Sequence, residues 1–261
     1  MRVGDVVAAV EGFAPASVQE SWDNSGLIIG SPADEVHGVL VGFDCTAALV
    51  EKARQAGCDM IVTHHPLIFK GIRRITPEDP VGEAVMLAIR YGIAVYAAHT
   101  SADKVSGGVS WAMAGRLGLQ NTCCLDPEGA PSPEGQTGLG VLGDLPEEMS
   151  GEQALDYVKT CFSLKVLRHS RPVERVRRVA LCGGSGGSLI ATALASGASL
   201  YISGDITYHQ FFTPRTFMIA DIGHFESEID IVGILAGEIR RRLPSLAVHA
   251  DSAPENPVFW R

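Results

Sequence analysis

CDMIVTHHPLIF (residues 58–69) joins a short apolar segment to two adjacent histidines. Residues 58–63 are typical of a buried strand, and Pro66 would end it because proline cannot donate to a sheet. Neighbouring strand residues point to opposite faces, so His64 and His65 converge only if the chain turns where the strand ends. The segment therefore predicts a strand that ends in two imidazoles. Taken alone, it also allows a pair of surface or hydrogen-bonded histidines.

The segments around this strand alternate between apolar strands and amphipathic helices. Strands are predicted over 36–44, 58–65 and 93–100, and helices over 45–57, 80–92 and 108–119. Repeats of this length imply parallel strands joined by right-handed crossovers. We therefore expect an α/β fold with mixed, largely parallel sheets.

The second half of the chain has the same character after an interruption. Residues 121–140, rich in Pro, Gly, Ser and Glu, predict a loop or a domain crossing. Ser150 is a possible N-cap of the helix that follows. Beyond it we expect strands over 175–182, 199–205, 217–223 and 246–251, a helix over 188–197 and one long helix over 224–243.

Two further segments place metal-ligand side chains just after apolar strands. Asp103 follows the strand that ends near His99, and His224 and Glu228 follow residues 217–223. Parallel strands of an α/β sheet present their carboxyl ends to one crevice, which can gather these side chains. His224 and Glu228 are four residues apart at a helix start and share one face. Glu226 faces elsewhere, so Glu228 is the better candidate.

Each of these residues also has an ordinary structural explanation. Asp103 occupies a turn context in which Asp commonly bonds the backbone, and the spacing does not distinguish it from His99 as a ligand. His99 could instead support a ligand or contact a substrate. Glu228 could simply interact with the helix macrodipole.

Three imidazoles and two carboxylates are too many ligands for one open catalytic ion, which usually takes three. They fit two divalent ions that share a carboxylate. A nitrogen and oxygen donor set without thiolate is compatible with Zn, Fe, Mn, Ni or Co. The five predicted ligands are His64, His65, Asp103, His224 and Glu228.

The glycine-rich segment CGGSGGS (182–188) could present backbone amides to an anion, or could be a tight strand-to-helix turn. It lacks the lysine of a P-loop. Asp205 and His209 lie at another strand end. We predict His99 and His209 as acid–base groups, since an unperturbed imidazole titrates near neutrality.

Composition excludes several other classes of protein. The formal net charge is -9 over 261 residues, which argues against general nucleic-acid binding. No apolar run is long enough to cross a membrane, and no signal peptide is evident. Six scattered cysteines form no CxxC pair, which favours a reducing, cytoplasmic location.

The chain resembles the Nif-three-like dinuclear metal centre proteins, also called YbgI-type proteins or GTP cyclohydrolase I type 2 homologues. The matching segments run in the family's order over almost the whole chain: WDNSGLIIG, GFDCT, DMIVTHHPLIFKGIRRI, AVYAAHTSADKVSGG, GGSGGSLI, YISGDITYHQ and ADIGHFESE. Two positions depart from the family's pattern. Ser101-Ala102 stand where Asn-Leu is common, and Ser110 stands where Asn is frequent.

The resemblance implies two α/β domains with the metal site in the crevice between them. We expect the first domain over 1–122 with about 235–261, and the second over about 123–234. By resemblance, Glu228 bridges the two ions, His65 and Asp103 complete one, and His64 and His224 complete the other. Several members form a ring-shaped hexamer, so the resemblance also implies a homohexamer.

Two functions follow as hypotheses. The first is a metal-dependent hydrolase of a nucleotide-like or other small phosphorylated or heterocyclic substrate, because two ions can activate a bridging water and stabilise both reacting oxygens. The alternative is a metal or metallocofactor trafficking or assembly protein without turnover. Its partner would be the metallocofactor in place of a small-molecule substrate.

Overall fold

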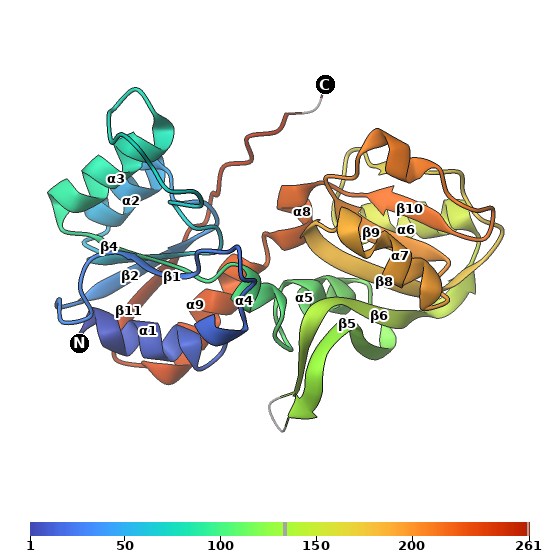
Figure 1. The fold of residues 1–261 in the computed structure, drawn as a ribbon, viewed down its shortest axis with the longest axis horizontal. Helices are drawn as coiled ribbons and strands as arrows, with labels where there is room; N and C mark the ends of the chain where they lie inside the picture. The colour runs from blue at the N-terminus through green and yellow to red at the C-terminus, as the bar shows by residue number, and fades with distance from the viewer. Residues whose placement is uncertain (133–134, 260) are drawn as a thin grey trace. The chain divides into compact units, whose positions relative to one another are not determined.

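The computed structural model describes residues 1–132, 135–259 and 261. The chain forms two compact units, each with its own sheet and helices (Figure 1). The first unit comprises residues 1–102 and 231–255, and the second comprises residues 103–230 and 256–261. No helix among the described residues is both long enough and apolar enough to cross a membrane.

The first unit is built on a five-stranded sheet in the order β1-β4-β3-β2-β11. All neighbouring pairs are parallel except β1 with β4. Figure 1 shows α2 and α3 on one face and α1 and α9 on the other. The strands are β1 Gly26–Ile29, β2 Gly38–Gly42, β3 Met60–Thr63, β4 Ala94–Ala97 and β11 Ala247–Ala250. The helices are α1 Val3–Glu11, η1 Ala16–Val18, α2 Ala47–Gln55, α3 Pro80–Tyr91 and α9 Ile231–Arg242, and α4 Thr100–Asp103 begins in this unit and ends with the first residue of the second.

The strand alternation explains why this sheet is covered on both faces. Leu40, Ile61 and Val95 pack with Leu49 and Val85, which lie on α2 and α3. Their neighbours along the strands point to the other face and are also fully buried. A parallel sheet buried on both faces requires such continuous apolar strands. The predicted strand-helix alternation over 36–119 is therefore confirmed.

The second unit contains a six-stranded mixed sheet in the order β5-β6-β8-β9-β10-β7. In Figure 1, α7 lies in front of this sheet and α6 lies behind it. The strands are β5 Gln120–Ser132, β6 Gly135–Met149, β7 Arg168–His169, β8 Val176–Ser185, β9 Leu200–Gly204 and β10 Met218–Asp221. The helices are α5 Val109–Arg116, α6 Gly151–Cys161, η2 Gly187–Leu189, α7 Ile190–Ala195, η3 Tyr208–Phe211 and α8 His224–Glu228.

The fold class is confirmed as α/β with two mixed, mostly parallel sheets. Five of the nine strand pairings among the described residues are parallel. The predicted N-cap is also present, because the Ser150 hydroxyl accepts a hydrogen bond from the Gln153 amide and the Gln153 side chain returns one.

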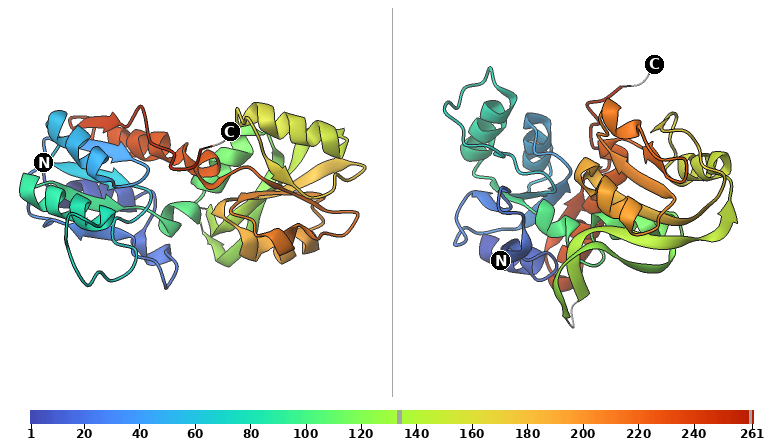
Figure 2. Two further views of the ribbon diagram at one scale, coloured as in Figure 1. Left: turned by 90° about the horizontal axis from the view of Figure 1, so that it is seen from above. Right: turned by 45° about the vertical axis from the view of Figure 1, so that its right-hand side comes forward.

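The loop predicted over 121–140 is wrong. β5 and β6 pair as the two strands of a long, curved hairpin, drawn in green in Figure 2. β5 is an edge strand with register shifts, and an edge tolerates Pro127, which has no amide proton to donate. Gly129, Gly138 and Gly140 have positive φ, so these glycines mark irregular positions within the strands. Their presence therefore did not indicate a loop.

The single helix predicted over 224–243 is also divided. α8 ends at Glu228 and α9 begins at Ile231. The break coincides with the point at which the chain leaves the second unit and re-enters the first. The carboxylate of Asp230, at the break, pairs with the Arg116 guanidinium at 3.4 Å.

Candidate metal centre

The carboxyl ends of β2, β3 and β4 bring the histidines of the first unit together. β3 lies between the other two strands, so the residues that follow all three strands meet at one edge of the sheet. The chain bends directly after Thr63, where the His65 amide donates to the Phe43 carbonyl at 3.1 Å. This bend lets both histidine rings converge, with ring centroids 4.8 Å apart.

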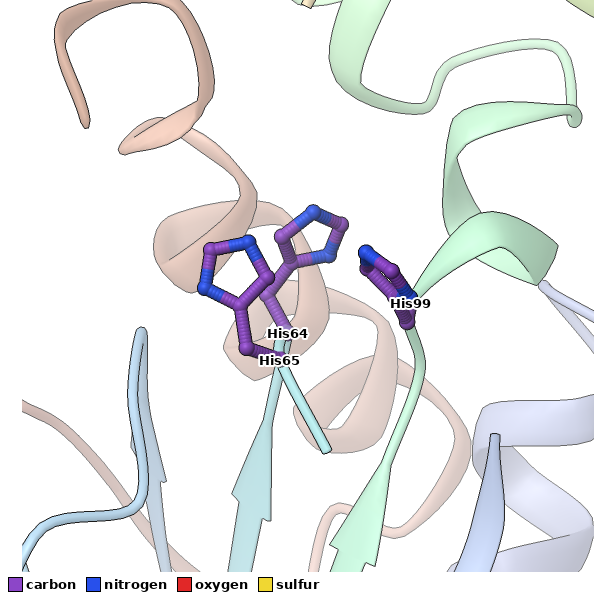
Figure 3. Close-up of side chains that lie close together, drawn as sticks. All are labelled: His64, His65 and His99. Atoms are coloured by element: carbon purple, nitrogen blue, oxygen red, sulfur yellow. The ribbon is translucent and has the colours of Figure 1, made fainter. Parts of the chain in front are cut away.

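His99 joins this pair from the end of β4 (Figure 3). Its ring centroid lies 5.4 Å from that of His64 and 5.4 Å from that of His65. One nitrogen from each of the three rings lies within 4.8 Å of the other two. His64 is fully buried, and 20% of the His65 side chain and 16% of the His99 side chain are exposed. This is a compact group of imidazoles able to hold a metal ion.

Each imidazole is anchored through Nδ1. The Nδ1 of His64 lies 3.0 Å from the Ala98 carbonyl, that of His65 lies 2.8 Å from Asp44 Oδ1, and that of His99 lies 2.7 Å from Asp23 Oδ1. These partners accept hydrogen bonds, so each Nδ1 is the donor and Nε2 is the remaining ring nitrogen. Metal-binding histidines use this arrangement, which fixes both the tautomer and the ring orientation.

Asp23 is the most strongly fixed of these anchors. Burial alone would raise the pKa of its carboxyl, but hydrogen bonds from His99 and Thr100 outweigh burial and hold the pKa well below its usual range. Its oxygens also accept from the Asn24 amide at 2.7 Å and the Ser25 hydroxyl at 2.9 Å. Asp23 therefore remains ionised and keeps the His99 Nε2 available as a base or a ligand.

In the second unit, α8 presents His224 and Glu228 on one face, as the four-residue spacing predicts. His224 Nε2 lies 3.0 Å from Glu228 Oε2, and His224 Nδ1 lies 2.8 Å from Asp205 Oδ2. Glu228 is buried, whereas the Glu226 carboxylate turns away and accepts from Asn256 at 3.0 Å. His224 thus shows the same Nδ1 anchoring as His64, His65 and His99.

Asp103 lies at the end of α4, and Cys182 connects its position to that of Glu228. Burial, followed by the charges of Asp103 and Glu228, raises the pKa of the Cys182 thiol well above its usual range. Both carboxylates therefore lie close to this sulfur within the second unit. The thiol stays protonated, which leaves carboxylate and imidazole as the charged or basic donors of this unit's site.

The glycine-rich segment at the end of β8 directs three of its backbone amides into the fold. The amides of Gly183, Gly184 and Gly186 donate to three serine hydroxyls at 3.2, 2.9 and 3.0 Å. These hydroxyls belong, in that order, to Ser110, Ser227 and Ser203. The three amides are therefore already used inside the fold.

Gly184 sits directly behind the Glu228 carboxylate. Its φ is +61°, and a Cβ placed on it would lie 2.1 Å from Glu228 Oε1 and 3.4 Å from His224 Cε1. Only glycine combines this backbone conformation with so close an approach. The glycine-rich segment, for which the sequence allowed two roles, thus lies against two of the predicted ligands, Glu228 and His224.

The two predicted acid–base residues have different surroundings. His99 belongs to the imidazole group described above. His209 is exposed on η3, where its ring packs against Tyr208 and Phe212 with centroids 5.2 and 6.3 Å away. These two aromatic residues also line a cavity of about 340 Å³ together with Arg168, His169 and Phe211.

An aromatic pair flanks His99 in the first unit. Trp22 and Phe69 are 60% and 44% exposed, and their ring centroids lie 6.0 Å apart. The ring centroids of Trp22 and Phe69 lie 6.3 and 5.9 Å from that of His99. Exposed aromatic side chains beside buried imidazoles form a surface on which a planar ring can stack.

The sequence analysis missed the functions of Asp23 and Asp44. Neither carboxylate was singled out from the sequence, although each supports an imidazole. The signal for Asp44 was its place at the carboxyl end of a strand next to the strand that carries the histidines. Asp205 was noted at a strand end without its role as the partner of His224.

Comparison with known proteins gives consistent matches. A family model described as Duf34/NIF3 (NGG1p interacting factor 3) matches residues 1–257. A GTP cyclohydrolase 1 type 2 homolog of Clostridium perfringens is 31% identical over 248 residues, covering 94% of each protein. A protein of the same name from Streptomyces coelicolor is 34% identical over 236 residues, covering 87% of this chain and 81% of that protein.

The fold is also found among solved structures. A Bacillus cereus protein related to NIF3 superposes with a TM-score of 0.93 at 23% identity, covering 100% of this chain and 99% of that chain. At this level of identity the likeness supports the fold alone. It agrees with the two mixed sheets described above.

Proposed function

Because the chain belongs to the Duf34/NIF3 family, as its motifs predicted, we propose that it is a dinuclear metal-dependent hydrolase. The substrate class is a nucleotide-like or other small phosphorylated or heterocyclic compound. The proposed ligands of the two divalent ions are His64, His65, Asp103, His224 and Glu228. The protein would work in the cytoplasm, where its six cysteines, all free, stay reduced.

The observation that carries this proposal is the shared anchoring of the histidines. Each of the three proposed histidine ligands has its Nδ1 bound to a carbonyl or carboxylate oxygen at 2.8 to 3.0 Å. Exposed His37 also has its Nδ1 3.2 Å from a carboxylate oxygen, that of Asp59, so the anchoring supports the proposal because the anchored rings also lie beside other possible ligands. Two buried or half-buried carboxylates, Asp103 and Glu228, supply the negative charge that two divalent ions require.

Two ions would lower the pKa of a bound water and stabilise the attacking and leaving oxygens of a displacement. His99, with its proton fixed on Nδ1 by Asp23, is our proposed general base, and His209 is a second candidate for proton transfer. The proposed pairing of ligands follows the family resemblance, with Glu228 bridging both ions.

A planar substrate is favoured by Trp22 and Phe69, the exposed aromatic pair beside His99. The name of the relatives, GTP cyclohydrolase 1 type 2 homolog, also refers to a purine nucleotide. A heterocycle stacked on Trp22 would bring its reactive carbon or attached phosphate toward the imidazoles.

We further propose that the protein is a homohexamer. Light scattering that gave a monomer at micromolar concentration would contradict this.

The decisive experiment combines metal analysis with a substrate screen on one sample. Protein purified without chelator and then supplied with metal should contain two ions per chain and should turn over a member of a nucleotide and phosphoester panel. Stripping the metal should abolish turnover, and restoring it should recover the activity. The matched control is His37→Ala, because His37 is an exposed histidine paired with Asp59 at 3.2 Å, away from the proposed ligands.

The other outcomes separate the alternative from the proposal. Two ions that exchange reversibly without any turnover would favour metal or metallocofactor trafficking over hydrolysis. One ion or none in the supplied protein would contradict the dinuclear centre itself.

A further inference from the structure

We propose that the first unit holds a complete mononuclear site of its own, formed by His64, His65 and His99, which captures the first divalent ion. This site needs no ligand from the second unit. His99 is the third ligand of its ion, a role additional to that of general base, and only the role as base rests on the proposed function.

Geometry supports the three-histidine site. One nitrogen from each ring already lies within 4.8 Å of the other two, and all three residues follow neighbouring strands of one sheet. Ligand nitrogens lie about 2.0–2.1 Å from a zinc ion, so the three nitrogens would have to move closer together than they are here to bind one ion. His64 is fully buried and stacks against Phe43, with ring centroids 5.9 Å apart, which limits its alternative positions.

Electrostatics and hydrogen bonding support His99 as the third ligand. Its Nδ1 donates to the buried, ionised Asp23, just as the Nδ1 of His65 donates to Asp44. An oriented imidazole with a carboxylate behind it is the arrangement found around catalytic zinc. Three imidazoles with an open fourth position are a complete ligand set for one such ion.

A three-histidine site explains why His99 lies so close to His64 and His65. A general base needs a correctly oriented imidazole, but it does not need a nitrogen within 4.8 Å of the nitrogens of two other imidazoles. Divalent ions that suit imidazole donors, including Zn, Ni, Fe and Co, are the class this site should take.

The test uses the full-length chain with the ligands of the second unit removed, as Asp103→Ala/His224→Ala/Glu228→Ala, titrated with Co²⁺. We expect one Co²⁺ per chain and three exchangeable N–H proton signals shifted by the paramagnetic ion, one from each Nδ1. Adding His99→Ala should remove one signal and weaken Co²⁺ binding by more than the ~10–100-fold typical of losing a supporting residue. Asp23→Asn serves as the supporting-residue comparison, and His37→Ala should change nothing.

Failure of this inference is distinct from failure of the proposed function. If the wild type binds two ions and the triple variant binds none, or if His99→Ala has no more effect than His37→Ala, the three-histidine site is wrong and the dinuclear centre stands. If the wild type binds one ion and the triple variant keeps it, the dinuclear centre is wrong and the three-histidine site stands. Should the triple variant not fold, stepwise titration of wild type against His99→Ala decides. Unchanged affinity for the first ion would then overturn the inference.

Discussion

At the scale of single residues, the candidate site is defined by how each ligand is held. Four histidines of the candidate site have Nδ1 bound to an oxygen, from Ala98, Asp44, Asp23 and Asp205. Sequence alone identified the histidines because they follow apolar strands. It could not identify their partners, because a hydrogen bond between residues 19 to 76 positions apart leaves no local pattern.

Glu228→Ala should lose both ions together, because a bridging carboxylate belongs to both coordination shells. Glu226→Ala is the matched control, since Glu226 lies on the same short helix and bonds Asn256 instead. The measurement is the metal content per chain after dialysis against metal-free buffer. If Glu228→Ala kept both ions at wild-type occupancy, Glu228 would not be the bridge.

Asp23→Asn should destabilise the metal-free protein by about 2 kcal/mol at neutral pH, the scale of hydrogen bonds to a charged group. The folded-state pKa of Asp23 lies below its unfolded value, so its contribution is fully present above the unfolded pKa of about 4. That contribution is lost as pH falls through the lower folded pKa. Urea unfolding from pH 7 to 3 should therefore show a constant difference that shrinks below about pH 4. A difference that grew on acidification would contradict the assignment.

At the scale of elements, the short helix α8 depends on the glycine-rich end of β8. Ser227 accepts from the Gly184 amide, and Gly184 leaves just enough space for the Glu228 carboxylate. The sequence predicted a strand, a turn and a helix here, but not the contact between Gly184 and Glu228. The close approach could not be predicted, because it depends on the packing of residues about 40 positions apart.

Gly184→Ala should reduce metal affinity at least tenfold, the scale for disturbing a supporting contact, and also lower stability. Its φ of +61° costs a non-glycine residue about 1 kcal/mol, and its Cβ would displace Glu228. Gly197→Ala separates the two effects, since Gly197 has φ +79° but nothing within 4 Å of a Cβ. The control should lose stability in thermal unfolding and keep its metal. Equal metal loss in both variants would show that backbone strain alone is responsible.

At the scale of the whole molecule, most of the fold could be predicted from periodicity. The strand-helix alternation of the first unit follows directly from its apolar runs, and both sheets are mixed as expected. The β5–β6 hairpin and the break between α8 and α9 could not be predicted locally. The hairpin strands carry turn-forming residues at an edge, and the break reflects where the chain passes from one unit to the other.

The backbone of Gly184 gives the carboxylate of Glu228 a rigid wall, and this has a consequence for ionic radius. With no space behind it, the carboxylate cannot retreat to accommodate a large cation. Calcium needs oxygen ligands at about 2.3–2.6 Å and six to eight of them, whereas zinc accepts oxygen at about 2.0–2.2 Å and also takes imidazole. Calcium in large excess should therefore leave bound Zn²⁺ or Co²⁺ in place, as measured by equilibrium dialysis. Displacement by calcium would mean that the backbone at Gly184 can move away from Glu228 and that ionic radius does not decide which ion is bound.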